Sequence, residues 1–402
     1  MNTTKYYAKD FVERDSNESP APAMERSVLI IGAGTFGTST AYHLATTYKD
    51  ASKVTIIDQA PSPPKPAAAI DVNRIIRTDY PNKLYCNLAN EAIHAWFWSL
   101  ELQRYFHKVG WIHMDEKDSD LSDRVRQVFR DREYDPTEDI PLDQLDEKYA
   151  VLEGTKTDGF RKAYFTREAG WCDAALATAS FMEAAVKRGV NRVTARVTEL
   201  IFDADKGRIE GVRTADGQHL KADQIVLAAG AWTSGLLSPV EDKLNMPEDD
   251  RIERQVQAAG RVAAYYKLSD EEVKQFSKPR MPVICYGEQG EVIPPSDSNK
   301  TLTYRNSATT FTNTVKTKSG AKISIPSSRD QHNVPEKLKQ ATAATITSKV
   351  MPDFVSDGRQ ADHWRICWDA VTPTEDWLMC KHPHSKLDNL HLAVGGSFHS
   401  YK

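Results

Sequence analysis

Long apolar runs are missing from this sequence. The longest apolar stretches, such as SVLIIGAG and QIVLAAGAW, are far shorter than the roughly 20 residues that a transmembrane helix requires. The N-terminal stretch MNTTKYYAKDFVERDSNESPAPAMER is polar and charged, with no apolar segment to form the core of a signal peptide. We therefore expect no membrane partner, a mobile tail over residues 1–25, and a reducing location in the cytoplasm or a peroxisome.

Basic clusters and paired cysteines are missing as well. The net charge is −4, and no run of lysine and arginine is longer than a residue or two, which argues against a nucleic-acid partner. Five cysteines are scattered without a CxxC pair or zinc-ligand spacing, so we expect neither a disulfide framework nor a metal site. A chain of 402 residues with 40% apolar and 27% charged residues is typical of a globular protein with two domains. A small-molecule substrate is the expected partner.

One glycine-rich segment carries the clearest signal. SVLIIGAGTFGTSTAYHLA predicts a strand, a tight turn through Gly32, Gly34 and Gly37, and a helix. Such glycines let the backbone approach a pyrophosphate, and the helix N-terminus offers it N–H groups and a positive dipole end. A second predicted strand, KVTIID, ends at Asp58, whose carboxylate suits a ribose 2′-hydroxyl and repels a 2′-phosphate. The motif predicts a dinucleotide site and leaves FAD and NAD open.

Residues 189–234 favour FAD. The segment GVNRVTARVTELIFDADKGRIEGVRTADGQHLKADQIVLAAGAWTS predicts a β-meander with turns at DADKG and ADG, followed by an apolar strand. A nicotinamide-dependent Rossmann domain usually continues with alternating strands and helices. A sheet insert followed by a return strand is instead how many FAD-binding domains are built.

Several further segments, in this order along the chain, carry a family resemblance. They are AAAIDVNRIIRTDY, GWCDAALATASFMEAAVKRGV, ADQIVLAAGAWTS, RICWDAVTPTEDWLMCKHP and the terminal GGSFHSYK. With the glycine motif, the chain resembles flavin-dependent amine oxidases of the sarcosine oxidase type from about residue 26 to 402. It is especially similar to the fungal branch of fructosyl amino acid oxidases (amadoriases) and saccharopine oxidases.

The resemblance gives a role to a cysteine that residue type alone assigns to the core. A buried cysteine between Ile366 and Trp368 is usually a small hydrophobe. In the family, the cysteine that matches Cys367 is bonded through sulfur to a ring methyl of FAD. The attacking form is the thiolate, so the resemblance implies an ionisable cysteine beside cationic groups, for which Arg365 is a candidate. The full set of cofactor-binding residues that we expect is Gly32, Gly34, Thr35, Phe36, Gly37, Asp58, Arg74, Val197, Gly230 and Cys367.

The resemblance also implies substrate and catalytic residues. Arg74 would lie against the flavin, and Arg77 would bind a substrate carboxylate through its two parallel donors, with Lys402 as a second cation. The residues alone allow Arg74 and Arg77 to be solvated, on either a helical or an extended segment. His399 matches the histidine of the family's terminal motif, where a flavin or substrate contact and a structural hydrogen bond both remain open. That motif departs from the family at Phe398 and Ser400, where the family has glycine.

One more cation is expected for the reaction with dioxygen. Lys300 aligns with a family lysine whose charge stabilises superoxide, a role that requires an ammonium largely removed from water. A lysine after Asp297, Ser298 and Asn299 is otherwise a turn residue, and Arg305 is the second candidate. The family chains also continue beyond the position of Lys402 with a segment that packs under the flavin.

These observations predict an α/β protein in two discontinuous parts. A Rossmann-like FAD-binding domain of the D-amino-acid-oxidase type is expected from residues 26–100, 160–236 and 364–402. An α+β substrate domain on an antiparallel sheet is expected from residues 101–159 and 237–363, with strands such as GRVAAYYKL, PVICYG, KTLTYR and AKISIP.

The expected activity is an FAD-dependent oxidation of the secondary amine of an N-substituted amino acid. A sarcosine-like, fructosyl amino acid or saccharopine-like substrate and dioxygen would give an imine and hydrogen peroxide, and a monomer is expected. Two alternatives remain open from the sequence. One is a flavin-binding protein without turnover because a C-terminal segment is missing, and the other is an NAD-dependent dehydrogenase.

Overall fold

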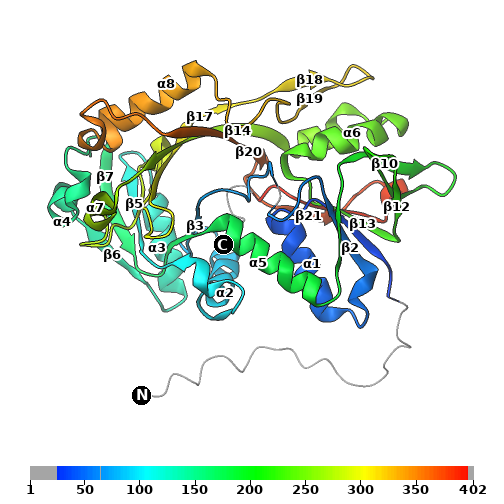
Figure 1. The fold of residues 1–402 in the computed structure, drawn as a ribbon, viewed down its shortest axis with the longest axis horizontal. Coiled ribbons are helices and arrows are strands. Elements are labelled where there is room, and N and C mark those ends of the chain that lie inside the picture. The colour runs from blue at the N-terminus through cyan, green and yellow to red at the C-terminus, as the bar shows by residue number, and fades with distance from the viewer. Residues whose placement is uncertain (1–24, 64, 397–402) are drawn as a thin grey trace.

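Two large sheets dominate the protein. In this computed structural model, residues 25–63 and 65–396 are described, and all but the last residue of the expected tail over residues 1–25 lies outside them. The sheets lie on opposite sides of the molecule, one beside the helices α1 and α5 and the other beneath α8 (Figure 1). None of the helices in the described ranges has the length and apolar character that crossing a bilayer would demand.

A six-stranded sheet holds the glycine-rich segment. Its order is β21-β22-β13-β1-β2-β9, in which all neighbours are parallel except the antiparallel pair β21 and β22. Both faces are covered, by α1 and α5 on one side and by α6 with the neighbouring meander on the other, so β1 is buried along its whole length. The bounds are β1 Val28–Ile31, β2 Val54–Asp58, β9 Asn191–Thr194, β13 Gln224–Leu227, β21 Leu378–Lys381, β22 Leu390–Val394, α1 Thr35–Thr47, α5 Ala174–Lys187 and α6 Thr233–Lys243.

The predicted meander is confirmed. Three antiparallel strands follow one another in the order β10-β11-β12, with bounds Val197–Asp203, Arg208–Thr214 and His219–Lys221. The turns fall at residues 204–207 and 215–218, where the sequence has DADKG and ADG. The chain then returns to the parallel sheet in β13, the apolar strand that the sequence analysis places next.

An eight-stranded sheet forms the other half of the protein. Its order is β20-β14-β17-β16-β15-β5-β7-β6, antiparallel except for the parallel pair β15 and β5. One face packs on apolar side chains from α4, α7 and the segment after α8. The bounds are β5 Trp111–Glu116, β6 Thr137–Ile140, β7 Phe160–Thr166, β14 Gln257–Lys267, β15 Val283–Cys285, β16 Gly290–Ile293, β17 Thr301–Phe311, β20 His363–Val371, α3 Leu121–Asp131, α4 Leu145–Lys148, α7 Asp270–Gln275 and α8 Glu336–Thr345.

Two strands differ from the sequence-based division into two parts, and a third predicted strand lies outside the large antiparallel sheet. β7 and β20 fall in ranges expected for the FAD-binding domain, but they pair with β5 and β14 in the eight-stranded sheet. The predicted strand AKISIP gives β19 (Lys322–Ser324), which pairs with β18 (Thr314–Lys316) in a separate hairpin. Strand propensity is local, whereas the choice of partner strand depends on the whole topology.

A small sheet and one helix connect the two halves. β3 (Arg74–Ile76) and β4 (Phe106–His107) both pair with β8 (Gly170–Cys172). Arg74 and Arg77 therefore belong to an extended segment, one of the two conformations that the sequence left open. In α2 (Lys83–Trp98), Trp96 is buried, whereas Trp98 is 76% exposed.

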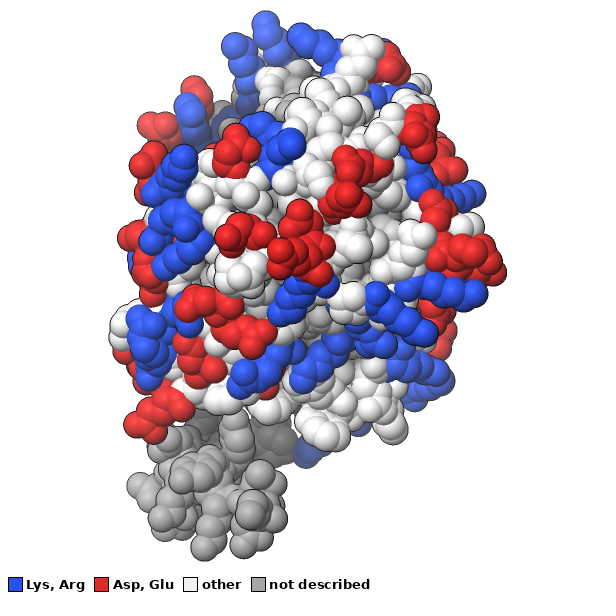
Figure 2. All heavy atoms as spheres, turned by 90° about the vertical axis from the view of Figure 1, so that its left-hand side faces the viewer, with Lys and Arg blue, Asp and Glu red and all other residues white. Residues whose placement is uncertain are grey.

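Charge is evenly mixed on the side of the molecule that carries α3, α4 and β6. Figure 2 shows lysine and arginine interspersed with aspartate and glutamate there, without a broad surface of one sign. Such a surface gives no electrostatic footprint for a nucleic acid. Nor do the described residues bring three metal-ligating side chains together in a cluster.

Candidate functional site

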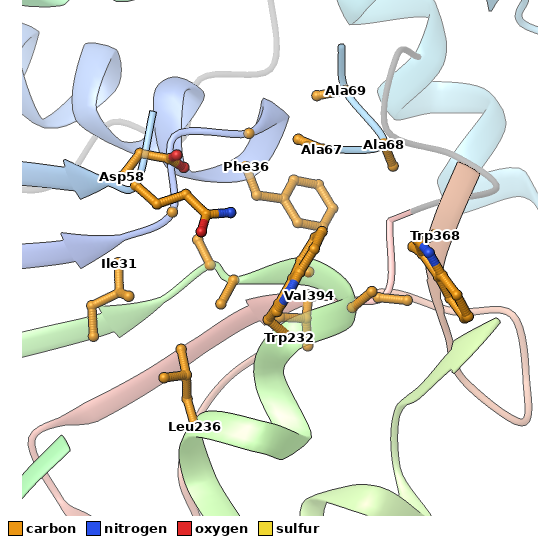
Figure 3. A pocket seen from close by; sticks show the side chains of 18 of the residues that line it. Ile31, Phe36, Asp58, Ala67, Ala68, Ala69, Trp232, Leu236, Trp368 and Val394 are labelled. Atoms are coloured by element: carbon orange, nitrogen blue, oxygen red, sulfur yellow. The ribbon is translucent and has the colours of Figure 1, made fainter. Parts of the chain in front are cut away.

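A cavity of about 320 Å³ opens at the carboxyl ends of the parallel strands. It is bounded by the ends of β1, β2, β13 and β22, by the loop 66–69, and by the start of β10. Figure 3 shows Asp58 at one end of the view and Trp368 at the other, with Trp232 and Ala67–Ala69 between them. Ligands of open α/β sheets bind at this edge, where strand order changes direction.

The glycine turn is shaped for close backbone approach. Gly32 has a φ of +102°, and a Cβ there would lie 2.4 Å from the Ala228 carbonyl oxygen. At Gly37, a Cβ would lie 1.8 Å from the Gly32 oxygen, so only glycine lets α1 pack this closely on β1. A Cβ at Gly34 would meet nothing nearer than Ala69 Cβ, at 3.9 Å. Gly34 is therefore glycine for a reason outside the chain's own packing.

Polar groups at this turn fit the pyrophosphate of a dinucleotide. Gly34 caps α1 without a side-chain bond, so the first N–H groups of the helix point toward the cavity edge. Thr35 lines the cavity, and its Oγ1 is buried without a hydrogen-bond partner. An unpaired buried hydroxyl beside a helix N-terminus is a fit for a phosphate oxygen. The remaining predicted cofactor residues of this region, Phe36, Val197 and Gly230, line the same cavity.

Asp58 occupies the end of β2, as the sequence predicts. Its Oδ2 accepts a hydrogen bond from Ala33 N at 2.8 Å, and its Oδ1 accepts one from Ala60 N at 3.1 Å. Burial raises the pKa of the Asp58 carboxyl, although both backbone bonds and Arg192 oppose this rise. The carboxylate retains acceptor capacity for a ribose hydroxyl because each oxygen has two lone pairs. Together with the turn, these contacts fit the adenosine and pyrophosphate parts of FAD.

A buried carboxylate with three arginines lies beyond the loop 67–69. Asp71 is contacted by Arg74 at 2.7 Å, by Arg305 at 3.0 Å and by Arg365 at 3.3 Å. Tyr265 donates a further hydrogen bond to it at 2.6 Å. The arginines outweigh the cost of burial and hold the pKa of Asp71 well below its usual range. We call Asp71 with these three arginines the Asp71 cluster.

Cys367 lies against this cluster. Its Sγ accepts a hydrogen bond from Arg74 Nη2 at 2.9 Å, and the thiol is buried on β20. Burial raises the pKa of Cys367, while Arg74 lowers it and Asp369 raises it further. The family resemblance predicts a cation beside the thiol. Arg74 is in contact with Sγ, and Arg365 is close enough to influence the thiol. The net direction is nevertheless upward, because desolvation is the largest effect.

The loop 67–69 joins the two parts of the site. The carbonyl of Ala68 accepts a hydrogen bond from Arg74, and that of Ala67 accepts one from Arg365 at 2.7 Å. Both alanines also line the dinucleotide cavity. Trp368 and Ala370 of β20 line that cavity, whereas Cys367 does not. Side chains alternate along a strand, so Cys367 leaves the opposite face of β20. The loop 67–69 therefore borders both the dinucleotide cavity and the Asp71 cluster.

Arg77 is held by its own neighbourhood. Its Nη1 donates to the carbonyl and, at 3.2 Å, to the carboxylate of Asp79, and its guanidinium lies over the rings of Tyr80 and Trp111. The other oxygen of Asp79 accepts from Tyr164 at 2.6 Å. The carboxylate of Asp79 raises the pKa of Arg77 in spite of burial, so the cation is permanent.

Lys300 lies at the surface. Its Nζ is 2.6 Å from Asp270 Oδ1, and the side chain is 48% exposed. The requirement for an ammonium removed from water is not met in this arrangement. Arg305, the second candidate, belongs to the Asp71 cluster, and its side chain is 18% exposed. His399 and Lys402 lie outside the described residues.

Two acids of this site, Asp71 and Asp369, were not among the residues predicted from the sequence. The available signals were short spacings. Asp71 precedes Arg74 by three residues, and Asp369 follows Cys367 by two, which places Cys367 and Asp369 on one face of β20. Neither spacing reveals Arg305, whose contact with Asp71 spans 234 residues.

Comparisons with known proteins identify the family of this chain. The family model "FAD dependent oxidoreductase" matches residues 27–402. L-saccharopine oxidase of Schizosaccharomyces pombe is 26% identical, and the match covers 94% of this chain and 87% of that protein.

Solved structures give the same picture. The fructosamine oxidase amadoriase II of Aspergillus fumigatus, in complex with FSA, has a TM-score of 0.79 at 27% identity, covering 95% of this chain and 84% of that one. Amadoriase I of Aspergillus fumigatus has a TM-score of 0.77 at 28% identity, with the same coverage. The match to the family model spans nearly the whole chain, and the cavity fits the cofactor of that family. The chain belongs to the DAO family of FAD-dependent oxidoreductases.

Proposed function

We propose that this protein is an oxidase of the secondary amine of an N-substituted amino acid. The amine and dioxygen would be converted into an imine and hydrogen peroxide. The chemistry that bound FAD supplies is acceptance of a hydride from the carbon beside the nitrogen and delivery of two electrons to dioxygen. The observation that carries the proposal is the Asp71 cluster beside Cys367, set next to a dinucleotide cavity. Relatives named as saccharopine and fructosamine oxidases support this substrate class.

Cys367 is the proposed point of covalent attachment to FAD. Cys367 precedes Trp368, which lines the cavity, and its thiol is in contact with the guanidinium of Arg74. A thioether there would fix the reactive ring near the arginines while the glycine turn holds the pyrophosphate. A group held at both ends loses little further freedom when substrate binds.

Arg77 is the proposed carboxylate-binding residue, with Lys402 as its partner. Asp79 and the aromatic rings fix its guanidinium, so a substrate carboxylate meets a donor that is already oriented. His399 is proposed to contact the flavin or the substrate. The protein is proposed to be a monomer in the cytoplasm or in peroxisomes.

The cation for dioxygen has two candidates, Lys300 and Arg305. Burial favours Arg305, because a charge in contact with bulk water contributes little to the stabilisation of superoxide. We expect Arg305→Met to slow reoxidation of reduced flavin and Lys300→Met to leave it nearly unchanged, measured by stopped-flow absorbance. A slow Lys300→Met variant would restore the role that the sequence assigned to Lys300.

The decisive test uses the purified protein and its flavin absorbance. Anaerobic addition of N-methyl and N-fructosyl amino acids or saccharopine should bleach the flavin, and air should restore it with release of hydrogen peroxide. A flavin that binds but is never bleached by any of these amines would support a binding protein without turnover. The family assignment does not favour the nicotinamide-dependent alternative.

A further inference from the structure

The thiol of Cys367 lies between a cation and a carboxylate. On one side, Arg74 Nη2 donates to Sγ at 2.9 Å. On the other, the thiol donates toward Asp369 Oδ1 at 3.7 Å, a distance within the range for hydrogen bonds of sulfur. Cys367 and Asp369 are two residues apart on β20, so their side chains leave the same face of the strand. Both are 8% exposed.

We propose that the carboxylate of Asp369 accepts the proton of the Cys367 thiol when FAD becomes attached. The protein would then carry its own base for this step. This inference rests on the covalent attachment proposed above.

Burial explains why a base within the chain is needed. Few water molecules can reach a thiol that is 8% exposed, and burial raises the pKa of the thiol from its ordinary value of 9.0. Burial also raises the pKa of Asp369, although Arg261 opposes this rise from 3.8 Å. A raised pKa makes the carboxylate of Asp369 a stronger base than that of an ordinary aspartate, which favours transfer of the thiol proton to it.

Asp71 is not an equivalent base. Its carboxylate already accepts hydrogen bonds from Arg74, Arg305 and Tyr265 and forms an ion pair with Arg365. The three arginines hold the pKa of Asp71 well below the usual range. Asp71 instead keeps Arg74 in place through the 2.7 Å contact with Nη1, while Nη2 of the same guanidinium reaches Sγ. Arg74 can therefore stabilise the sulfur anion at the moment when Asp369 takes the proton.

The step balances in atoms and electrons. Sγ forms a bond to the ring methyl carbon, and the S–H bond and one methyl C–H bond are broken. The thiol proton goes to Asp369, the methyl C–H bond leaves its electron pair in the ring, and the methyl proton is released to solvent. Dioxygen, the oxidant of the proposed function, removes those two electrons and takes up two protons, as many as the thiol and the methyl group have lost, to give hydrogen peroxide.

The test compares Asp369→Asn with wild type after FAD is added to protein expressed without flavin. Bound flavin that stays with the acid-precipitated chain, and a mass gain of one FAD in the intact protein, report attachment independently of turnover. We expect Asp369→Asn to bind FAD but to attach it about a hundredfold more slowly at neutral pH, the scale of a lost general base. Asp115→Asn is the matched control, because Asp115 is also buried and paired with an arginine, Arg161 at 2.8 Å, but lies on β5.

The direction in which the attachment rate changes separates a role of Asp369 as a base from a purely electrostatic role. Asp369 also raises the pKa of Cys367 by its charge, so a merely repulsive role predicts faster attachment in Asp369→Asn. Faster or unchanged attachment overturns the inference while leaving covalent FAD intact. If wild type itself never attaches FAD, the proposed attachment fails as well.

The pH profile of wild type gives a measurement that needs no variant. The charged groups that face the pair from the described residues are Asp71, Arg74, Arg261, Arg305 and Arg365. All of the arginines stay charged over the working range, so the profile reports Asp369 and Cys367. With Asp369 as base, the rate of attachment should rise as Asp369 ionises and then stay constant up to the pKa of the thiol. A rate that climbs until the pH exceeds the raised pKa of the thiol would show that the thiol ionises without Asp369.

Discussion

At the scale of single residues, charge compensation decides what each ionisable group can do. Arg77 has a permanent counter-ion in Asp79, whereas the three arginines around Asp71 share a single carboxylate. The Asp71 cluster therefore has a surplus of positive charge in a buried place. Such a surplus favours an anion beside it, whether a thiolate or an electron-rich flavin. Arg77 instead offers directed donors within a nearly neutral pair.

Arg77→Ala tests the carboxylate contact. We expect the KM for an amino acid substrate to rise by about tenfold or more, since a hydrogen bond to a charged group is lost, with a smaller effect on kcat. Arg77→Lys should recover only part of the affinity because it cannot donate two parallel bonds. Steady-state peroxide release gives both constants, and kinetics equal to wild type would remove Arg77 from the substrate site.

Glu241 is expected to make stability depend on pH. It is fully buried, one oxygen accepts from Ile252 N at 2.7 Å, and burial raises its pKa from 4.5 to about 7. The folded state thus binds more protons than the unfolded state between these values, so stability falls as pH rises through this window and the loss is complete above it. Two and a half pKa units correspond to about 3 kcal/mol.

Glu241→Gln removes this dependence. The amide is neutral at every pH, and its oxygen can still accept from Ile252. We expect the variant to be more stable than wild type at about pH 8 and close to it at about pH 5. Urea unfolding at both pH values measures the difference, and an equal difference at both would contradict the assignment.

At the scale of elements, the turn between β1 and α1 combines two different reasons for glycine. Gly32 and Gly37 are required by packing within the chain, because a Cβ would overlap a backbone oxygen. Gly34 has room for a Cβ, yet it lines the cavity where the pyrophosphate is expected. The same motif thus holds structural and ligand-facing glycines, and only the tertiary structure distinguishes them.

Alanine variants separate these two reasons. Gly34→Ala should fold normally and lose affinity for FAD, because its methyl group would enter the cavity. Gly37→Ala should lose stability with or without FAD, since a Cβ 1.8 Å from the Gly32 oxygen forces α1 away from β1. Thermal unfolding without FAD and flavin titration measure the two effects. Equal FAD affinity in Gly34→Ala and wild type would argue against this turn as the pyrophosphate site.

At the scale of the whole molecule, the proposed cofactor spans both large sheets. Its dinucleotide end is expected at α1 beside the six-stranded sheet, and its attachment point is on β20 of the eight-stranded sheet. FAD would therefore connect two halves that pack through the loop 67–69 and the small sheet of β3, β4 and β8. A covalent link makes this connection independent of the concentration of free cofactor.

Cys367→Ser tests that connection. Without the thioether, stability of the variant should rise with free FAD by about 1.4 kcal/mol for each tenfold increase above its Kd. Wild type, with FAD attached, should melt at the same temperature whether or not free FAD is added. Thermal melts across a range of FAD concentrations make the comparison. A wild-type melt that follows free FAD in the same way would contradict covalent attachment.

Prediction from the amino-acid sequence alone succeeds for the glycine-rich turn, the meander and the residues at the strand ends. These features are set within short segments, because the alternation of apolar residues, the glycine spacing and the turn residues all act locally. The family resemblance added Cys367, Arg74 and Arg77 from motifs, again by position along the chain. It could not separate Lys300 from Arg305, whose burial depends on the strands that surround them.

The tertiary structure decided which charges meet. Arg74 and Cys367 are 293 residues apart, and Asp71 and Arg305 are 234 apart, so their contacts exist only because β3, β17 and β20 converge. The pairing of β20 with β14 fixes which side of the strand Cys367, Arg365 and Asp369 face. Register and strand order are properties of the folded chain as a whole, and they turn three separate motifs into one site.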